Sequence, residues 1–489
     1  LPIAMSESAT PKHYDLFCIG AGVGMKIAKN CAVDLGWTVG IAEADKVVGT
    51  CLNRGCIPSK AFIHPADLIR HIEHCPTLNV NVGPATIDYT ATVDRVCARI
   101  DATEAGARKG LNSVPGLDLI PHFCRFVGPK TLEINGQTVT ADRIVVNTGC
   151  KPMIPGIEGL ADTPFMTSTD ILRRRDRTNK LVVLGGGFIA CELAHWQAAA
   201  GVEVTQMVRS KIVKHCDEEI RDEFIKMYTK HITVMEHTVP SKVTFSEDTK
   251  LFSLTMPSGE VMECDGLLVA TGVVPATKGL GVETAGLETN RQGYIVADKY
   301  FRTNVEGVYS VGDINGQALF RHAANYQQAS VMAQFASGVS WANADKECPA
   351  LGLDRALNPC PAAVFSYPTI AYAGLNERDI TVPYVKHVQW FKNTGKAAAL
   401  LPETGFVKLL VSTETKAIIG IHLIGQDSDV LIHALLPYVW SETGIDEILM
   451  AGTIIHPSLT EVLRGCLFNV RAKLLAEGVE MNPLARYMA

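Results

Sequence analysis

Two glycine-rich turns, each between an apolar strand and a helix, constrain the fold of this chain more than any other feature. The first turn runs from Gly20 to Met25, after an expected strand at Tyr14–Ile19. The second runs from Gly185 to Ala190, after an expected strand at Leu181–Leu184. Such a turn lets a dinucleotide pyrophosphate approach the N-terminus of the following helix. Two β-α-β units of this kind predict an α/β protein with two Rossmann-like nucleotide-binding domains.

The first unit has the features of a dinucleotide site. A helix is expected to Leu35, and a second strand at Thr38–Glu43 ends in an acid that can bind a ribose hydroxyl. The usual third glycine is replaced by Met25, so we expect looser packing of helix on strand. An ordinary strand–helix turn is the alternative. The candidate binding residues are Gly20, Gly22, Gly24 and Glu43.

The second unit differs where its second strand ends. After a helix to Ala200 and a strand at Val202–Val208, the position of the ribose-binding acid is Val208, and Arg209 follows it. A carboxylate would repel a 2′-phosphate, whereas an arginine would pair with it. Alternatively, Arg209 is only an exposed residue at a strand end. The first site then suits FAD and the second NADPH.

Two cysteines, Cys51 and Cys56, follow the first unit and precede an expected helix at Ser59–Arg70. The positive end of a helix favours a thiolate, which is the reactive form in disulfide exchange. Cysteines that merely pack in a turn are the alternative. The glycines and the proline around the pair favour a redox-active dithiol beside a bound cofactor.

The segment from Gly49 to Lys60 resembles the redox-active segment of the pyridine nucleotide–disulfide oxidoreductases. The segments Val145–Gly149, Val269–Gly272 and Val308–Asp313 are similar to other family motifs, so the resemblance spans nearly the whole chain. Within the family, the motifs are most similar to mycothione reductase and lipoamide dehydrogenase. The resemblance implies FAD, NADPH and a homodimer. Asn147 and Val273 depart from the family pattern.

The resemblance also implies roles for individual residues. Cys51 and Cys56 would form the redox disulfide, and His456 of the other subunit would act as general acid–base, oriented by Glu461. Lys60 and Glu192 would form an ion pair near the flavin. Phe188 would cover the flavin, although a core phenylalanine is the alternative. The implied FAD contacts are Gly49, Thr50, Lys60, Thr148, Gly149, Gly312 and Asp313, besides the residues of the first turn. The implied NADP contacts are Gly185, Gly187, Phe188, Ile189, Glu192, Arg209 and Gly272.

Composition narrows the class of protein. The net charge of −6 argues against a nucleic-acid partner, and the sequence has no apolar stretch long enough to span a bilayer. The N-terminus lacks the features of a signal peptide, and 14 scattered cysteines favour a reducing compartment. We expect a cytoplasmic enzyme, or a mitochondrial one if a transit peptide was removed. The C-terminal stretch has Cys466 but no second dithiol, which argues against large thioredoxin reductases and mercuric reductases.

The motifs divide the chain into four segments. We expect FAD-binding parts at 1–155 and 285–355, a nucleotide domain at 156–284 and an interface domain at 356–489, with a linker at 339–361 containing Cys348 and Cys360. In the interface domain we expect strands at Phe406–Thr413 and Ile418–Ile424. Helices are expected there at Ser428–Thr443 and Leu459–Leu475.

The leading hypothesis is an NADPH-dependent reductase of a low-molecular-weight disulfide. The first alternative is an NAD-dependent dihydrolipoamide dehydrogenase. The second is a flavoprotein without disulfide turnover that acts as a binding or scaffold protein. No metal site is expected.

Overall fold

The computed structural model describes residues 11–343 and 360–488. These form two compact units, which alternate along the chain. The first unit contains residues 1–58, 97–151 and 273–357, and the second contains residues 59–96, 152–272 and 358–489. The four-segment division of the domains stays a prediction. Most of the expected linker, including Cys348, lies outside the described residues.

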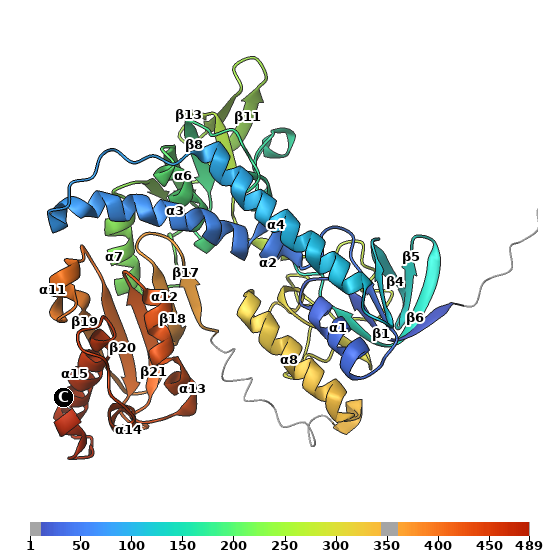
Figure 1. Ribbon diagram of the computed structural model, residues 1–489. Coiled ribbons are helices and arrows are strands. Elements are labelled where there is room, and N and C mark those ends of the chain that lie inside the picture. The colour runs from blue at the N-terminus through green and yellow to red at the C-terminus, as the bar shows by residue number, and fades with distance from the viewer. Residues whose placement is uncertain (1–10, 344–359, 489) are drawn as a thin grey trace, which may run out of the picture. The chain divides into compact units, whose positions relative to one another are not determined.

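The first unit is built on a seven-stranded sheet with the order β3-β2-β1-β6-β5-β4, in which β16 also pairs with β6. Its central strands are parallel, and α1 and α8 pack together beside them (Figure 1). The strands are β1 (Lys12–Ile19), β2 (Val39–Ala42), β3 (Leu117–Ile120), β4 (Cys124–Gly128), β5 (Thr131–Ile134), β6 (Gln137–Val146) and β16 (Val308–Ser310). The helices are α1 (Gly24–Asp34), α2 (Gly49–Arg54) and α8 (Arg321–Ser337), and the two-stranded sheet pairs β7 (Cys150–Pro152) with β15 (Val273–Pro275).

The second unit contains the second glycine turn, on a parallel sheet of order β10-β9-β8-β14. These strands are β8 (Lys180–Leu184), β9 (Glu203–Val208), β10 (Thr233–Glu236) and β14 (Gly266–Val269). An antiparallel sheet adds β11 (Lys242–Ser246), β12 (Leu251–Thr255) and β13 (Val261–Cys264). The helices are α5 (Ser168–Ile171), α6 (Phe188–Ala199) and α7 (Glu218–Tyr228). Two longer helices, α3 (Cys56–His74) and α4 (Tyr89–Asn112), each continue across a boundary between the units.

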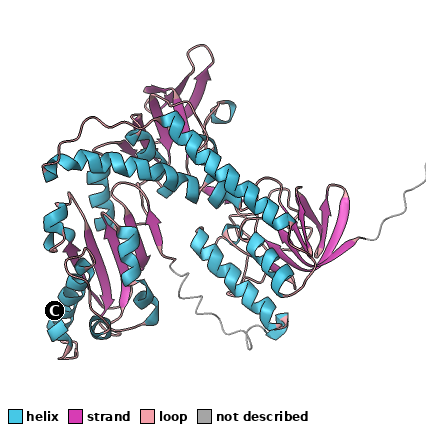
Figure 2. Cartoon of the chain, in the orientation of Figure 1, coloured by secondary structure: helices cyan, strands magenta, loops and turns pink. Residues whose placement is uncertain are grey.

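The C-terminal part of the second unit is an antiparallel five-stranded sheet of order β17-β18-β21-β20-β19, against which α15 packs (Figure 2). Its strands are β17 (Ala362–Val364), β18 (Ile370–Gly374), β19 (Tyr384–Trp390), β20 (Phe406–Ser412) and β21 (Ile418–Ile424). Its helices are α11 (Ala397–Leu400), α12 (Ser428–Leu431), α13 (Leu436–Ser441), α14 (Ile445–Met450) and α15 (Glu461–Ala476). Apolar side chains of these strands and of α15 form one buried cluster.

The element predictions agree with the structure within a few residues, with one exception. The single helix expected at Ser428–Thr443 is wrong, because α12 and α13 are separate helices joined by a 3₁₀ turn at Ile432–Ala434. Pro437 lies in the first turn of α13. Proline has no N–H to donate and clashes with the preceding turn, so it starts a helix rather than continuing one.

Across the described ranges 11–343 and 360–488, no helix combines the length and the apolar character that crossing a membrane requires. The part of the tail after α15 ends in a 3₁₀ turn at Ala485–Met488. Cys466 lies on α15, is fully buried, and donates its thiol hydrogen to the carbonyl of His387.

Candidate active site and nucleotide sites

The first glycine turn lies directly against the end of β6. Gly20 has φ of +97°, and a Cβ atom there would approach the Asn147 carbonyl oxygen to 2.8 Å. Gly24 donates its N–H to Oδ1 of Asn147 over 3.1 Å, and a Cβ on Gly24 would overlap that side chain. The looser packing expected from Met25 is therefore wrong, because Gly24 provides the close approach of helix to strand.

The surroundings of this turn fit a polar ligand. Among the buried side-chain atoms without a hydrogen-bond partner in the described residues are Nδ2 of Asn147, Oγ1 of Thr148 and Oγ of Ser310, which belong to residues at or beside the end of β6. Burial raises the pKa of Asp313 to about 6, and Arg321 offsets part of this rise. Glu43 lies at the turn, where its Oε2 accepts the N–H of Ala21 over 2.8 Å. A group with phosphates and hydroxyls, such as FAD, would supply hydrogen-bond partners for these buried atoms. The glycine turn would let its phosphates approach the backbone closely.

The two cysteines occupy the starts of two consecutive helices. Cys51 lies in α2, and Cys56 is the first residue of α3, which begins earlier than the expected Ser59. Both residues are half-buried. A Cβ on Gly49, the first residue of α2, would lie 2.9 Å from the Cα of Gly22. The segment that carries the cysteines therefore starts against the first glycine turn, within the first unit.

Lys60 and Glu192 meet in the second unit. The Lys60 ammonium lies 2.7 Å from Oε2 of Glu192, whose side chain is only 4% exposed. Burial raises the pKa of Glu192, and the charge of Lys60 offsets part of this rise. Phe365 completes the group, because its N–H donates to Oε1 of Glu192 over 3.1 Å and its ring lies 4.4 Å from the ammonium. A buried carboxylate is thus balanced by a cation and a backbone donor.

The second glycine turn is packed tightly onto the adjoining strands. A Cβ on Gly185 (φ +134°) would overlap the carbonyl of Ala270, and a Cβ on Gly186 would contact the side chain of Val208. Gly187 precedes α6 as its N-cap, and Phe188 and Ile189, the first residues of that helix, are half-buried. Beside the turn, Gly272 (φ +125°) accepts the N–H of Met153 on its carbonyl. The second glycine turn therefore leads directly into α6.

The strand end after this turn has no acid. Val208 is buried, and Arg209, which follows it, is exposed, as are Lys211 and Lys214. The structure therefore places a short basic segment where a ribose-binding carboxylate would otherwise stand.

His456 and Glu461 form a dyad at the start of α15. Nδ1 of His456 lies 2.7 Å from Oε1 of Glu461, and Oε2 accepts the N–H of Ser458. The hydrogen bond from His456 lowers the pKa of Glu461, so this carboxylate stays ionised. An ionised carboxylate only accepts, so Nδ1 carries the proton and Nε2 is left to exchange one. The His456 side chain is 75% exposed, beside a cavity of about 340 Å³.

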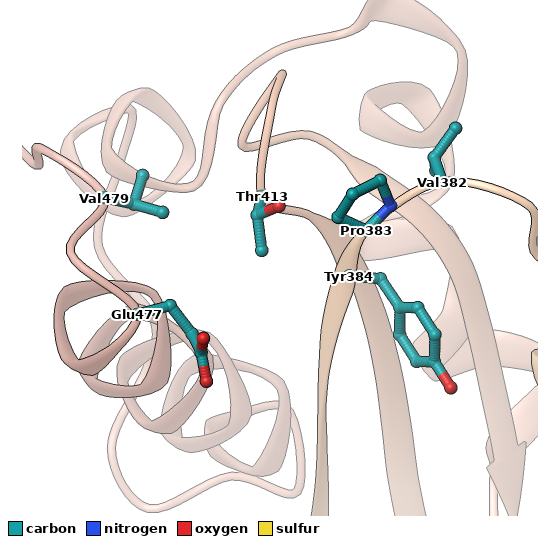
Figure 3. Close-up of a pocket in the computed structure, with 6 residues that line it drawn as sticks. All are labelled: Val382, Pro383, Tyr384, Thr413, Glu477 and Val479. Carbon is teal, nitrogen blue, oxygen red and sulfur yellow. The ribbon is translucent and has the colours of Figure 1, made fainter.

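Another cavity, of about 490 Å³, shares no residue with the predicted site (Figure 3). It is lined by Val382, Pro383, Tyr384, Thr413, Glu477 and Val479. Within the described part of the chain, no cluster of three or more His, Cys, Asp or Glu side chains could hold a metal ion.

Sequence reasoning did not give Phe365 a role at the Lys60–Glu192 pair. Its contacts come from a segment far along the chain, and no local pattern marks an aromatic residue as a contact of a buried ion pair. Asn147 was identified only as a departure from the family pattern. In the structure it lies against the first glycine turn and donates no hydrogen bond to a described residue.

Comparison with known proteins agrees with this architecture. Residues 14–334 match the pyridine nucleotide-disulphide oxidoreductase family, and residues 360–465 match the dimerisation domain of that family. A mycothione reductase of Mycobacterium tuberculosis is 28% identical over 473 residues, which cover 94% of this chain and 99% of that protein. The chloroplastic dihydrolipoyl dehydrogenase 2 of Arabidopsis thaliana is 30% identical, over 92% of this chain and 81% of that protein.

A mercuric reductase of Lysinibacillus sphaericus is 28% identical over 86% of this chain and 76% of that protein. Among solved structures, the HOCl-induced flavoprotein disulfide reductase RclA from Escherichia coli has a similar fold. Its TM-score is 0.79 at 23% identity, over 94% of this chain and all of that one. The chain therefore belongs to the pyridine nucleotide–disulphide oxidoreductases, a family of enzymes that use FAD and a nicotinamide nucleotide.

Proposed function

We propose that this enzyme is an NADPH-dependent reductase of a low-molecular-weight disulfide. The observation that supports this most is the end of β9, where buried Val208 is followed by exposed Arg209. A guanidinium there suits a 2′-phosphate, and Lys211 and Lys214 add positive charge nearby. Glu43, at the first glycine turn, suits the ribose of FAD instead.

The proposed chemistry assigns a role to each residue of the redox site. Bound FAD would supply the two-electron relay between NADPH and the Cys51–Cys56 disulfide. The thiolate of Cys51 would attack one sulfur of the substrate disulfide, and the other sulfur would leave as a thiol with the proton of His456. Cys56 would then displace the second thiol and close the Cys51–Cys56 disulfide. Glu461 would hold His456 in the tautomer described above.

We further propose a homodimer in which each subunit supplies His456 to the disulfide of the other. The match to the family's dimerisation domain supports this arrangement. His456 and its neighbour Ile455, which is 82% exposed, are candidates for burial by the partner subunit. The cytoplasmic location stays a prediction.

Steady-state rates with NADPH and NADH test the cofactor assignment. We expect NADPH to be favoured about tenfold or more, because a hydrogen bond to a charged group contributes about 1.5–3 kcal/mol. A clear preference for NADH would support the dihydrolipoamide dehydrogenase alternative. A panel of lipoamide, glutathione, mycothione and bis-thiol disulfides would identify the substrate, and failure to turn over any disulfide would support the binding-protein alternative.

A further inference from the structure

The basic segment, residues 209–217 between β9 and α7, is held at its midpoint by hydrogen bonds to the second glycine turn and to β10. Val213 donates its N–H to the carbonyl of Gly186 in the second glycine turn, over 2.7 Å. Ile212 donates its N–H to Oε1 of Glu236 over 2.6 Å, and Arg221 binds the same carboxylate. The segment is therefore joined directly to the turn that would hold the pyrophosphate.

The second half of the basic segment is held by the C-terminal sheet's own connection between β18 and β19. Nδ2 of Asn376 donates to the carbonyl of His215 over 3.2 Å. The guanidinium of Arg378 donates to the carbonyls of Lys214 and Cys216 over 3.0 and 3.2 Å. Two side chains thus bind three successive carbonyls. This contact joins the interface domain to the basic segment.

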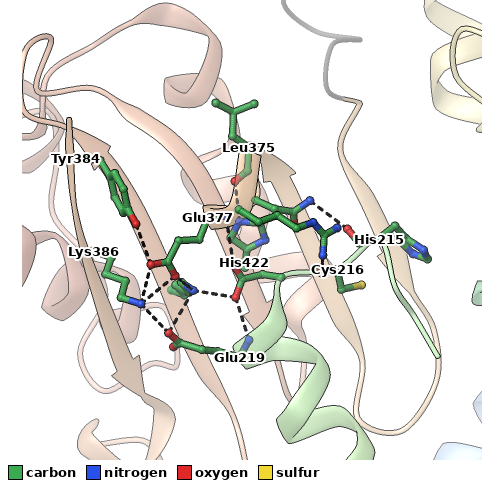
Figure 4. A network of polar contacts seen from close by, with 12 residues as sticks. His215, Cys216, Glu219, Leu375, Glu377, Tyr384, Lys386 and His422 are labelled. Atoms are coloured by element: carbon green, nitrogen blue, oxygen red, sulfur yellow. Dashed lines mark hydrogen bonds and ion pairs between the residues drawn. The ribbon is translucent and has the colours of Figure 1, made fainter. Parts of the chain in front are cut away.

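A buried charge cluster secures the end of the basic segment. The Lys408 ammonium, whose side chain is 1% exposed, lies 2.8 Å from Oδ1 of Asp217 and 2.5 Å from Oε2 of Glu377. Asp217 also caps α7, because its side chain accepts the N–H of Glu219. Lys386 bridges Glu219 and Glu377, so the cluster continues onto β19 (Figure 4). Loss of Lys408 would leave the carboxylates of Asp217, Glu219 and Glu377 without this buried cation.

The backbone of the basic segment shows that its shape is imposed by these contacts. Val213 is fully buried and has φ of 39°, in the left-handed region. A β-branched residue disfavours that region, and such a conformation persists only where the surrounding structure determines it. The segment is therefore held in one conformation, although Arg209, Lys211 and Lys214 are exposed.

We propose that Asn376, Arg378 and Lys408 are positioning residues for recognition of the NADPH 2′-phosphate. This inference rests on the proposed use of NADPH. The interface domain would fix the backbone that carries Arg209, Lys211 and Lys214, so that binding a 2′-phosphate does not have to order the segment. Recognition of the rest of the nucleotide would depend on the glycine turn, which these three residues do not touch.

The test compares binding of 2′,5′-ADP and 5′-AMP by isothermal titration of the FAD-loaded enzyme and of an Asn376→Ala/Arg378→Ala double variant. The side chain of Arg378 is 42% exposed, so the variant should fold. We expect its Kd for 2′,5′-ADP to rise by about tenfold, while the Kd for 5′-AMP changes less than about twofold. Asn376→Ala alone should give a smaller change in the same direction.

Arg177→Ala is the matched control. Arg177 also donates to a backbone carbonyl, that of Ala200, but it does not contact the basic segment. It should leave both Kd values unchanged. Native enzyme that does not prefer 2′,5′-ADP over 5′-AMP would contradict the proposed use of NADPH. A native preference that survives in the double variant, or an equal loss of affinity for both ligands, would instead overturn the positioning role alone.

Discussion

The ammonium of Lys60 lies 2.7 Å from Oε2 of Glu192, so that an almost fully buried carboxylate on α6 depends on a cation from α3. Phe365 donates its N–H to the other oxygen and places its ring beside the ammonium. The pair therefore holds the two helices and the first residues after β17 in one arrangement.

Substitution of Lys60 should destabilise the protein more than substitution of Glu192. Lys60→Met leaves Glu192 buried without its cation, and we expect a loss of about 2–4 kcal/mol in the free energy of unfolding. Glu192→Gln keeps the acceptor for Phe365 and leaves a lysine that is 35% exposed, so about 1 kcal/mol is expected. Urea denaturation of the FAD-loaded enzyme at pH 7.5 measures both. Equal losses would show that burial of Glu192 does not determine the stability of the pair.

Asp313→Asn should stabilise the FAD-free chain but weaken its binding of FAD. Burial raises the pKa of Asp313 from 3.8 to about 6, so ionising it in the folded chain costs free energy. This cost is absent below about pH 3.8, grows from there to pH 6 and is complete above pH 6. The FAD-free variant should therefore be more stable than the native chain by about 1–3 kcal/mol at pH 8, and equally stable at pH 3.8.

The same substitution should weaken FAD binding about tenfold or more, if the carboxylate accepts a hydrogen bond from the cofactor. Fluorescence titration of the FAD-free protein measures this Kd. An unchanged Kd would remove Asp313 from the FAD site, and an unchanged stability at pH 8 would show that its burial carries no cost.

The Lys408 cluster predicts a specific sensitivity to acid. Burial alone would raise the pKa of Glu377, but hydrogen bonds from Lys386, Lys408 and Tyr384 outweigh it and lower the pKa from 4.5 to about 2. The stability that Glu377 contributes is complete above pH 4.5 and is lost as the pH falls toward 2.

Glu377→Gln should therefore reduce the difference in unfolding free energy between pH 6 and pH 3, by roughly 1–2 kcal/mol. Urea midpoints across that range measure it. Glu247→Gln is the control, because Glu247 and its partner Lys250 are both at least 70% exposed and such surface pairs contribute little. If the unfolding free energies of the native enzyme and of Glu377→Gln changed in parallel with pH, ionised Glu377 would not contribute the expected stability.

The sequence predicted the parts of the fold that follow from local patterns. The glycine turns, the strands before them and β21 have their expected places because periodicity and turn residues are local properties. The expected helix at Ser428–Thr443 is wrong because its apolar pattern continues across Pro437, where a new helix begins. The pairs Lys60–Glu192 and His456–Glu461 were predicted through the family resemblance, and the structure brings both together.

The contacts of Phe365 and the charge cluster around Lys408 could not be predicted in this way. Lys408 lies in the middle of an apolar strand, and its partners come from α7 and from the turn before β19. Only the tertiary structure shows that this lysine is buried among carboxylates, because nothing within β20 specifies which residues lie opposite it.

Substitution of Cys51 and substitution of Cys56 should change the visible absorbance of the bound flavin in different ways. If Cys56 is the thiol nearest the flavin, Cys51→Ser should show a long-wavelength band from a thiolate stacked on oxidised flavin, without added reductant. Cys56→Ser should lack this band even after partial reduction. Visible spectra of the two variants, with Cys466→Ser as a control for a buried cysteine outside the predicted pair, test the assignment. A band that survives in Cys56→Ser would show that Cys51, and not Cys56, is the thiol nearest the flavin.

His456→Ala should lower disulfide turnover by about two to four orders of magnitude, the usual contribution of a general acid–base group. Flavin reduction by NADPH should be nearly unchanged, because that half-reaction does not use the proton of His456. Stopped-flow absorbance separates the two half-reactions. Similar slowing of both would indicate that the substitution damages the structure instead.

Mixing His456→Ala with Cys51→Ser enzyme tests the shared active site most directly. Each variant is expected to be inactive alone, and a hybrid dimer would contain one intact site, with its cysteines from one chain and its histidine from the other. With equal amounts and complete subunit exchange, disulfide turnover should recover to about a quarter of the native rate, since half of the dimers are hybrids with one working site. No recovery of turnover, despite subunit exchange proven by mass-labelled subunits, would contradict an active site shared between the two subunits.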